Sequence, residues 1–167
     1  TVLASRAGAV GFDALLWANL PDGGGLSSSA ASMAALGFLA AGINGVKLER
    51  LSYAGQLQEA EHRFAGVRCG LMDQLAVLCG APDSALLIDC RSLEMKPAPL
   101  PADWLLVVLD TGVRHNLAAS EYNRRVAECA EVVAALRQRR PEISSLREAD
   151  YPDLEALAGL VPEKSLG

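Results

Sequence analysis

A glycine- and serine-rich segment, PDGGGLSSSA at residues 21–30, carries the strongest chemical signal in the sequence. Glycines let an anion approach the backbone closely, and serines favour helix N-termini, where free N–H groups and the helix dipole attract negative charge. Serine hydroxyls also suit phosphate oxygens or a hard cation such as Mg²⁺. A structural turn with good N-caps is the alternative, but three glycines and three serines exceed what capping requires. The predicted phosphate-binding residues are Gly23, Gly24, Gly25, Leu26, Ser27, Ser28 and Ser29.

Three better-known glycine motifs do not fit this segment. A P-loop needs a lysine directly after its last glycine, whereas the nearest lysine here is Lys47. The dinucleotide-binding motif needs a third glycine where Ser28 stands, and the serine-hydrolase elbow needs one where Ser29 stands. The segment therefore indicates a different kind of phosphate loop.

Glu61 is the second candidate, because it falls inside the apolar face of a helix predicted over residues 48–64. A buried carboxylate is costly unless it is paired or binds a metal. The sequence leaves two interpretations open: a salt bridge to Arg63 or Arg68 near the helix end, or a metal ligand.

Asp73 and Tyr122 are the remaining candidates. Asp73 lies in the segment GLMDQLAVL with apolar neighbours on nearly every side, so it is either a first-turn carboxylate, favoured by the helix dipole, or a general base or electrostatic anchor aimed into a cleft. Tyr122 begins the apolar stripe of a long predicted helix. It is either a core residue or a residue whose hydroxyl reaches a polar ligand.

The apolar patterning predicts a mixture of helices and strands without regular alternation, which favours the α+β class. The helix over residues 48–64 should bury Tyr53 and Phe64, and Pro97, Pro99 and Pro101 indicate a stiff exposed connector. The expected elements are a buried strand over residues 10–18, helices over 27–41, 48–64 and 71–78, strands over 85–89 and 104–110 (the latter fully buried), and a helix over 118–139 whose apolar stripe is Tyr122, Val126, Cys129, Val133 and Leu136.

Composition excludes several classes of protein. The chain has 167 residues, of which 51% are hydrophobic and 21% are charged, so it can bury a core and is not disordered overall. A net charge of −5 argues against binding to nucleic acid or to acidic membranes. No apolar run reaches the roughly 18 residues of a membrane span. The four cysteines lack C-x-x-C spacing, which argues against a zinc ribbon, and free thiols are typical of a cytoplasmic protein.

The segment PDGGGLSSSA resembles the second signature of the GHMP small-molecule kinases. Three further segments, EAEHRFAGVRCGLMDQ, ALLIDCRSLE and DTGVRHNLAASEYNRR, follow it in the order and spacing of the galactokinases. The chain is therefore identified by resemblance as a member of the galactokinase family. Nothing before Gly11 matches the family's first signature, and its third glycine-rich signature is not found after Tyr122.

The resemblance implies a two-domain α+β GHMP kinase fold that is incomplete here, with residues 1–80 in the N-terminal domain and 81–167 starting the C-terminal domain. It implies that the glycine–serine loop holds ATP, that Ser29 and Glu61 hold Mg²⁺, and that Asp73 is catalytic. Asp73 and Tyr122 would contact the sugar.

The implied activity is that of an ATP-dependent sugar kinase, which transfers the γ-phosphate to the anomeric hydroxyl of D-galactose to give galactose 1-phosphate. Its partners would be galactose and ATP, without nucleic acid, membrane or an obligate protein partner, in the cytoplasm. A non-catalytic galactose and ATP sensor and an N-acetylgalactosamine kinase are the alternatives. We expect an internal fragment that has little or no activity alone and that self-associates.

Overall fold

The computed structural model describes residues 9–21, 24–110, 112 and 118–157. It divides into two compact units, Thr1–Asn116 and Leu117–Gly167. The first unit contains α1 (Ser28–Ile43), α2 (Arg50–Ala60), the π-helical turn η1 (Glu61–Ala65), α3 (Met72–Cys79), β1 (Ser84–Ile88) and β2 (Met95–Pro99). The second unit contains α4 (Ala118–Arg137), the 3₁₀ turn η2 (Leu146–Glu148) and α5 (Tyr151–Ala156). The predicted domains 1–80 and 81–167 stay a prediction.

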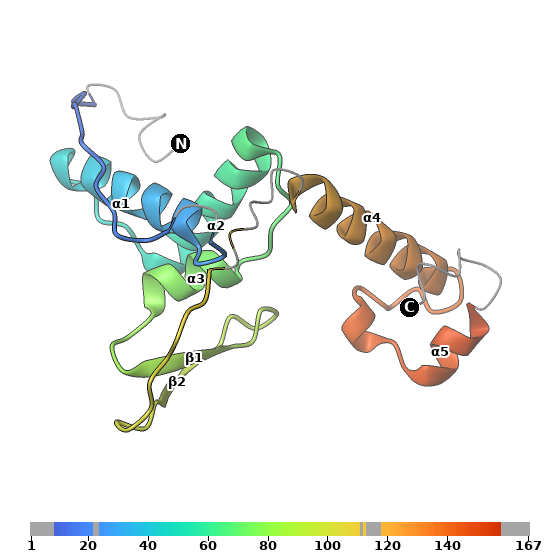
Figure 1. Cartoon of the computed structure of the whole chain (residues 1–167). Coiled ribbons are helices and arrows are strands. Elements are labelled where there is room, and N and C mark those ends of the chain that lie inside the picture. Colours follow the sequence, from blue (N-terminus) through green and yellow to red (C-terminus); the bar gives the residue numbers. More distant parts are fainter. Residues whose placement is uncertain (1–8, 22–23, 111, 113–117, 158–167) are drawn as a thin grey trace. The chain divides into compact units, whose positions relative to one another are not determined.

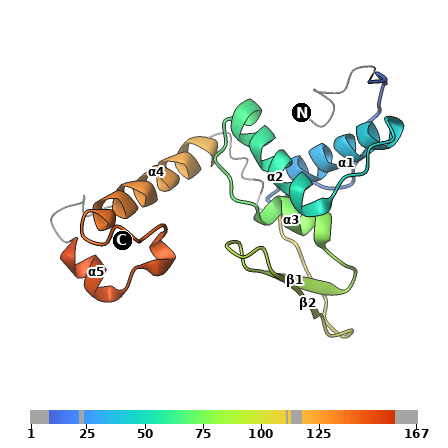
Figure 2. The same cartoon turned by 180° about the vertical axis from the view of Figure 1, so that it is seen from behind.

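Three helices form the core of the first unit. In both views α3 lies between the helices α1 and α2 and the hairpin of β1 and β2 (Figure 1, Figure 2). Tyr53 of α2 is 1% exposed, and its hydroxyl donates to the carbonyl oxygens of Met33 (3.0 Å) and Ala34 (3.1 Å) in α1. This packing joins the first half of α1, which follows the glycine–serine loop, to α2, which leads to Glu61. The buried core residues are Ala34, Tyr53, Ala54, Leu57, Leu75 and Leu78.

The strand predicted over 85–89 is confirmed as β1, but the predicted proline connector is wrong. Met95–Pro99 forms β2, which pairs antiparallel with β1 from Ser84↔Pro99 to Ile88↔Met95. Within the described residues this sheet has two strands. Each strand of such a sheet has one unpaired side, where a proline without an N–H group is tolerated.

The strands predicted over residues 10–18 and 104–110 are not formed. Neither segment has regular secondary structure, and both expose apolar side chains, with Leu15 95% and Leu105 85% exposed. An apolar run becomes a buried strand only where other strands pair with it and cover it. The described part of the chain offers neither segment such a partner.

The helix predicted over 48–64 is correct in its first part. Tyr53 and Leu57 are buried as predicted. At Glu61 the chain changes to π-helical hydrogen bonding, which alters the direction of the following side chains. The predicted burial of Phe64 is therefore wrong, because Phe64 is 80% exposed.

The second unit is built on the C-terminal half of α4. Leu136 is buried as the apolar stripe predicts, but Tyr122 is 46% exposed and Cys129 is exposed, so the stripe is not buried along its full length. A helix buries only the part of its apolar face that other segments cover. Those segments come from the chain after α4. The core residues are Val132, Leu136, Ile143 and Leu157.

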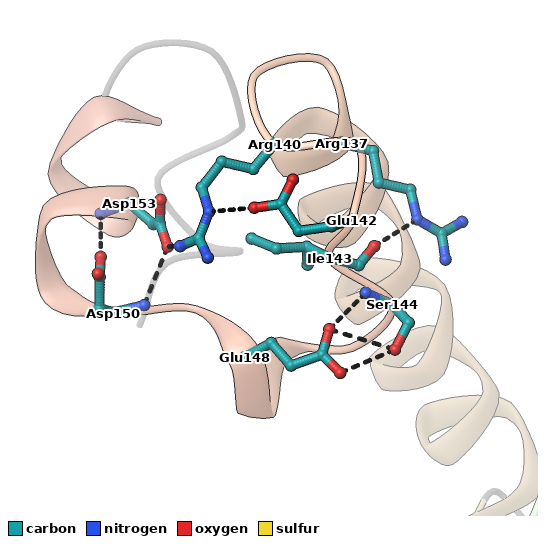
Figure 3. Close-up of polar contacts among 8 residues, drawn as sticks. All are labelled: Arg137, Arg140, Glu142, Ile143, Ser144, Glu148, Asp150 and Asp153. Carbon is teal, nitrogen blue, oxygen red and sulfur yellow. Dashed lines mark hydrogen bonds and ion pairs between the residues drawn. The ribbon is translucent and has the colours of Figure 1, made fainter.

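Polar contacts fasten the segment after α4 (Figure 3). Arg137 donates from Nε to the carbonyl oxygen of Ile143 at 2.7 Å. Arg140 donates to Glu142 at 2.9 Å and to Asp153 at 2.5 Å. These contacts fasten the segment around Ile143 to the end of α4 and to α5. No helix among the described residues is both long and apolar enough to cross a membrane.

Candidate functional site

The glycine–serine loop leads directly into α1. Asp22 and Gly23 lie outside the described residues. Gly25 has a φ of +74°, which glycine adopts at little cost. Ser27 precedes α1 with a φ of 54°, in the left-handed region, and its side chain makes no capping hydrogen bond to the helix. The Ser27 hydroxyl is therefore free to bind a group outside the helix. The left-handed backbone conformation of Ser27 costs about 1 kcal/mol or more.

Two serine–carboxylate pairs join this loop to distant parts of the chain. Ser27 Oγ donates to Asp73 Oδ1 at 2.8 Å, across 46 positions of sequence. Ser29 Oγ donates to Glu61 Oε1 at 2.7 Å, across 32 positions. The structure thus brings four of the predicted site residues together at the N-terminal end of α1.

Asp73 lies in the first turn of α3. The N-cap of this helix, Leu71, makes no side-chain capping bond, so a negative charge in the first turn compensates the helix dipole. The predicted first-turn position is confirmed. The bond from Ser27 shows that the carboxylate also faces the glycine–serine loop.

Glu61 is the first residue of the π-helical turn η1. Its second carboxylate oxygen, Oε2, accepts hydrogen bonds from Gln74 Nε2 at 2.7 Å and Cys69 Sγ at 2.9 Å. The predicted alternative of a salt bridge to Arg63 is not formed, because Arg63 pairs with Glu59 at 3.3 Å. Turns of the π type often occur at functional sites. Here the turn directs Glu61 toward Ser29.

The loop before α3 is held by two side chains of α2 and η1. Gln58 Nε2 donates to the carbonyl oxygen of Cys69 at 3.0 Å, and His62 Nε2 lies 2.9 Å from the same oxygen. Burial, with smaller contributions from the hydrogen bond and charge of Glu61, raises the pKa of the Cys69 thiol to about 11. The thiol is therefore protonated at neutral pH and can serve as a donor to Glu61.

Two members of this site, Cys69 and Gln74, were not identified from the sequence. Gln74 is completely buried. A glutamine beside Asp73 in an otherwise apolar run was the signal available in the sequence, and only the structure shows that it is buried.

Comparisons with known proteins show which proteins this chain resembles. Residues 1–81 match the family model "GHMP kinases N terminal domain". The galactokinase of Chloroflexus aurantiacus is 45% identical over 152 residues, which are 91% of this chain and 39% of that protein. The dog galactokinase is 43% identical over 155 residues, or 92% of this chain and 38% of the relative. Over most of its length this chain is therefore similar in sequence to galactokinases.

A solved structure supports the same relationship. The galactokinase of Lactococcus lactis, determined in complex with galactose, superposes with a TM-score of 0.70 and 28% identity over 88% of this chain and 38% of that one. The predicted family resemblance and the α+β GHMP kinase fold are thereby confirmed. The chain spans about two fifths of the length of the curated galactokinases that it matches.

The site at the start of α1 presents hard oxygen donors suited to a divalent cation. Ser29 Oγ and Glu61 Oε1 lie 2.7 Å apart. The described residues contain no group of three or more His, Cys, Asp and Glu side chains able to hold a metal. Mg²⁺ nevertheless fits, because it is usually bound through one or two carboxylates together with phosphates and waters.

Tyr122 lies in the second unit, on α4. Its side chain is 46% exposed, so it is not the core residue that the sequence left open as an alternative. The other predicted site residues that the structure describes lie in the first unit. Its role at the sugar stays a prediction.

Proposed function

We propose that this chain forms the phosphate-binding and catalytic part of a galactokinase, which transfers the γ-phosphate of ATP to the anomeric hydroxyl of D-galactose. The cluster of Ser27, Ser29, Glu61 and Asp73 is the observation that carries the proposal. It joins the glycine–serine loop to two carboxylates from separate segments. Phosphoryl transfer needs mainly positioning and charge neutralisation, and these groups supply both.

The glycine–serine loop binds the triphosphate of ATP in this proposal. The positive φ of Gly25 and the free N–H groups at the start of α1 suit close approach of an anion. The hydroxyls of Ser27 and Ser29 become donors to phosphate or ligands of the cation. A hollow of about 250 Å³ beside the loop, lined by Trp17, Ser28 and Ser32 among others, is large enough for part of the nucleotide.

Ser29 and Glu61 hold Mg²⁺, which supplies neutralisation of the phosphate charge when it is bound. Asp73 orients the anomeric hydroxyl of galactose or accepts its proton. Ser27 holds one oxygen of this carboxylate at 2.8 Å, which limits its rotation. Tyr122 contacts the sugar. We assign the protein to the cytoplasm, with galactose and ATP as its small-molecule partners.

The first test is ATP binding by the purified chain, measured by titration calorimetry with Mg²⁺ present. Intact mass is determined on the same sample. Ser29→Ala should weaken binding, because it removes a donor to phosphate and the cation. Ser92→Ala, a serine in the turn after β1, is the matched control and should bind normally. No binding by the unchanged chain would contradict the phosphate loop.

Catalysis is tested by ADP release with galactose, with N-acetylgalactosamine and without sugar. We expect little or no turnover from these 167 residues alone. Any galactose-dependent release should disappear in Asp73→Asn and persist in Asp83→Asn, an exposed aspartate before β1 with a φ of 53° that asparagine tolerates. Release that survives Asp73→Asn would refute the catalytic role of Asp73.

A further inference from the structure

We propose that Gln74 is a positioning residue for Glu61: its amide holds the Oε2 atom of Glu61, so that Oε1 is kept at Ser29 and available to a divalent cation. The inference rests on the proposed cation site, but it concerns residues that the proposed function does not use. It assigns a role to the one completely buried polar side chain of the described core.

The geometry divides the two oxygens of Glu61 between two tasks. Oε2 faces inward and accepts from Gln74 Nε2 at 2.7 Å and from the thiol of Cys69 at 2.9 Å. Oε1 accepts from the Ser29 hydroxyl at 2.7 Å. Two donors on one oxygen prevent the carboxylate from turning over. Carboxylates that bind metals are commonly oriented in this way.

Gln74 itself is held rigidly. Its side chain is 0% exposed, and the neighbouring Leu75 belongs to the core that α3 forms with α1 and α2. A glutamine amide can reorient on a surface, but close packing removes that freedom here. The Nε2 atom also donates to Cys69 Sγ at 3.6 Å, so the two donors to Glu61 Oε2 contact each other as well.

The two polar atoms of the Gln74 amide differ in how they are used, because Nε2 donates to Glu61. The Oε1 atom of Gln74 is buried and has no hydrogen-bond partner within the part of the chain that is described. A leucine of similar volume would remove this unsatisfied atom. Gln74→Leu removes a destabilising buried acceptor together with the stabilising hydrogen bond to Glu61, so a loss of cation affinity in this variant reports on the orientation of Glu61 rather than on overall stability.

The experiment measures binding of Mn²⁺ to the full 167-residue chain, with and without ATP, from the loss of the free-ion EPR signal. Gln74→Leu should weaken Mn²⁺ binding about 10-fold or more. Its urea midpoint should stay close to that of the unchanged chain, because removal of the unsatisfied Oε1 atom offsets loss of the hydrogen bond to Glu61. Gln58→Leu is the matched control, because Gln58 donates to the Cys69 carbonyl and not to Glu61. It should leave Mn²⁺ affinity unchanged.

A second measurement needs no cation. The coupling between Ser29→Ala and Glu61→Gln is determined from urea unfolding, first with Gln74 present and then in Gln74→Leu. Positioning by Gln74 predicts a measurable coupling that falls toward zero in the variant. Gln74→Met replaces Gln74→Leu if the latter does not fold.

Unchanged Mn²⁺ affinity and unchanged coupling in Gln74→Leu would overturn the inference. An equal loss of affinity in Gln58→Leu would also overturn it, because the loop rather than the amide would then be responsible. If the unchanged chain binds no Mn²⁺, the proposed cation site fails, and the coupling measurement alone decides the role of Gln74.

Discussion

Gly37 of α1 is the position where a single methyl group should separate α1 from α2. A Cβ atom added to Gly37 would lie 1.7 Å from Tyr53 Oη and 2.6 Å from Tyr53 Cζ. Tyr53 cannot move aside freely, since it is 1% exposed and its ring packs edge-on against Phe38 with centroids 5.3 Å apart. Gly37→Ala must therefore displace the tyrosine or the helix.

Opposing effects set the change in the free energy of unfolding that Gly37→Ala causes. Alanine favours a helix over glycine by about 1 kcal/mol. Overpacking of a close-packed core costs about 1–3 kcal/mol, and loss of the Tyr53 hydrogen bonds to α1 costs about 1 kcal/mol more. We expect Gly37→Ala to lower the free energy of unfolding by about 1–3 kcal/mol. Gly42, in the same helix, has no atom within 4 Å of an added Cβ. Gly42→Ala should therefore stabilise the chain.

Urea unfolding followed by circular dichroism measures both variants. Tyr53→Phe removes the hydroxyl, so the double variant Gly37→Ala/Tyr53→Phe should lose less than the two single losses combined. Relief should be partial, because the contact of 2.6 Å with Cζ remains. A Gly37→Ala chain as stable as Gly42→Ala would refute the packing argument, and so would strictly additive losses.

Three further predictions concern Cys69, Glu49 and Leu136. Cys69, whose pKa is raised to about 11, should react with iodoacetamide at about pH 8 more slowly than the exposed Cys90, as peptide mass spectrometry would show. Glu49 accepts backbone N–H bonds at the start of α2, chiefly from Ser52, which lowers its pKa. Its stabilisation is present above the ordinary value of 4.5 and lost as pH falls through the lowered pKa. Urea midpoints should therefore show Glu49→Gln more destabilising at about pH 6 than at about pH 3; equal losses at both would contradict this. Leu136→Ala should cost about 2–5 kcal/mol in the second unit by the same assay, and a loss below about 1 kcal/mol would contradict its place in the core.

Local chemistry explains why several elements could be predicted from the sequence. The glycines and serines of residues 23–29 predict a helix start, and α1 begins at Ser28. The apolar run after Gly70 predicts a short helix, and α3 covers Met72–Cys79. These signals depend on neighbours one turn away, so they act within a single segment.

Strands and buried faces depended on distant partners. Residues 10–18 and 104–110 are as apolar as many strands, but pairing decides whether such a run is a strand. The prolines of Met95–Pro99 argued against a strand, yet pairing with β1 makes one. The π-helical turn at Glu61 likewise exposes Phe64, which helical periodicity had placed in the core.

The sequence by itself determined the chemical groups of the candidate site: the hydroxyls of Ser27 and Ser29 and the carboxylates of Glu61 and Asp73. Only the tertiary structure decided which hydroxyl meets which carboxylate, and that Gln74 holds the inner oxygen of Glu61. The physical reason is the range of the interactions. Side-chain hydrogen bonds require alignment to within a few tenths of an ångström between segments 13 to 46 positions apart, and only packing of α1, α2 and α3 provides it.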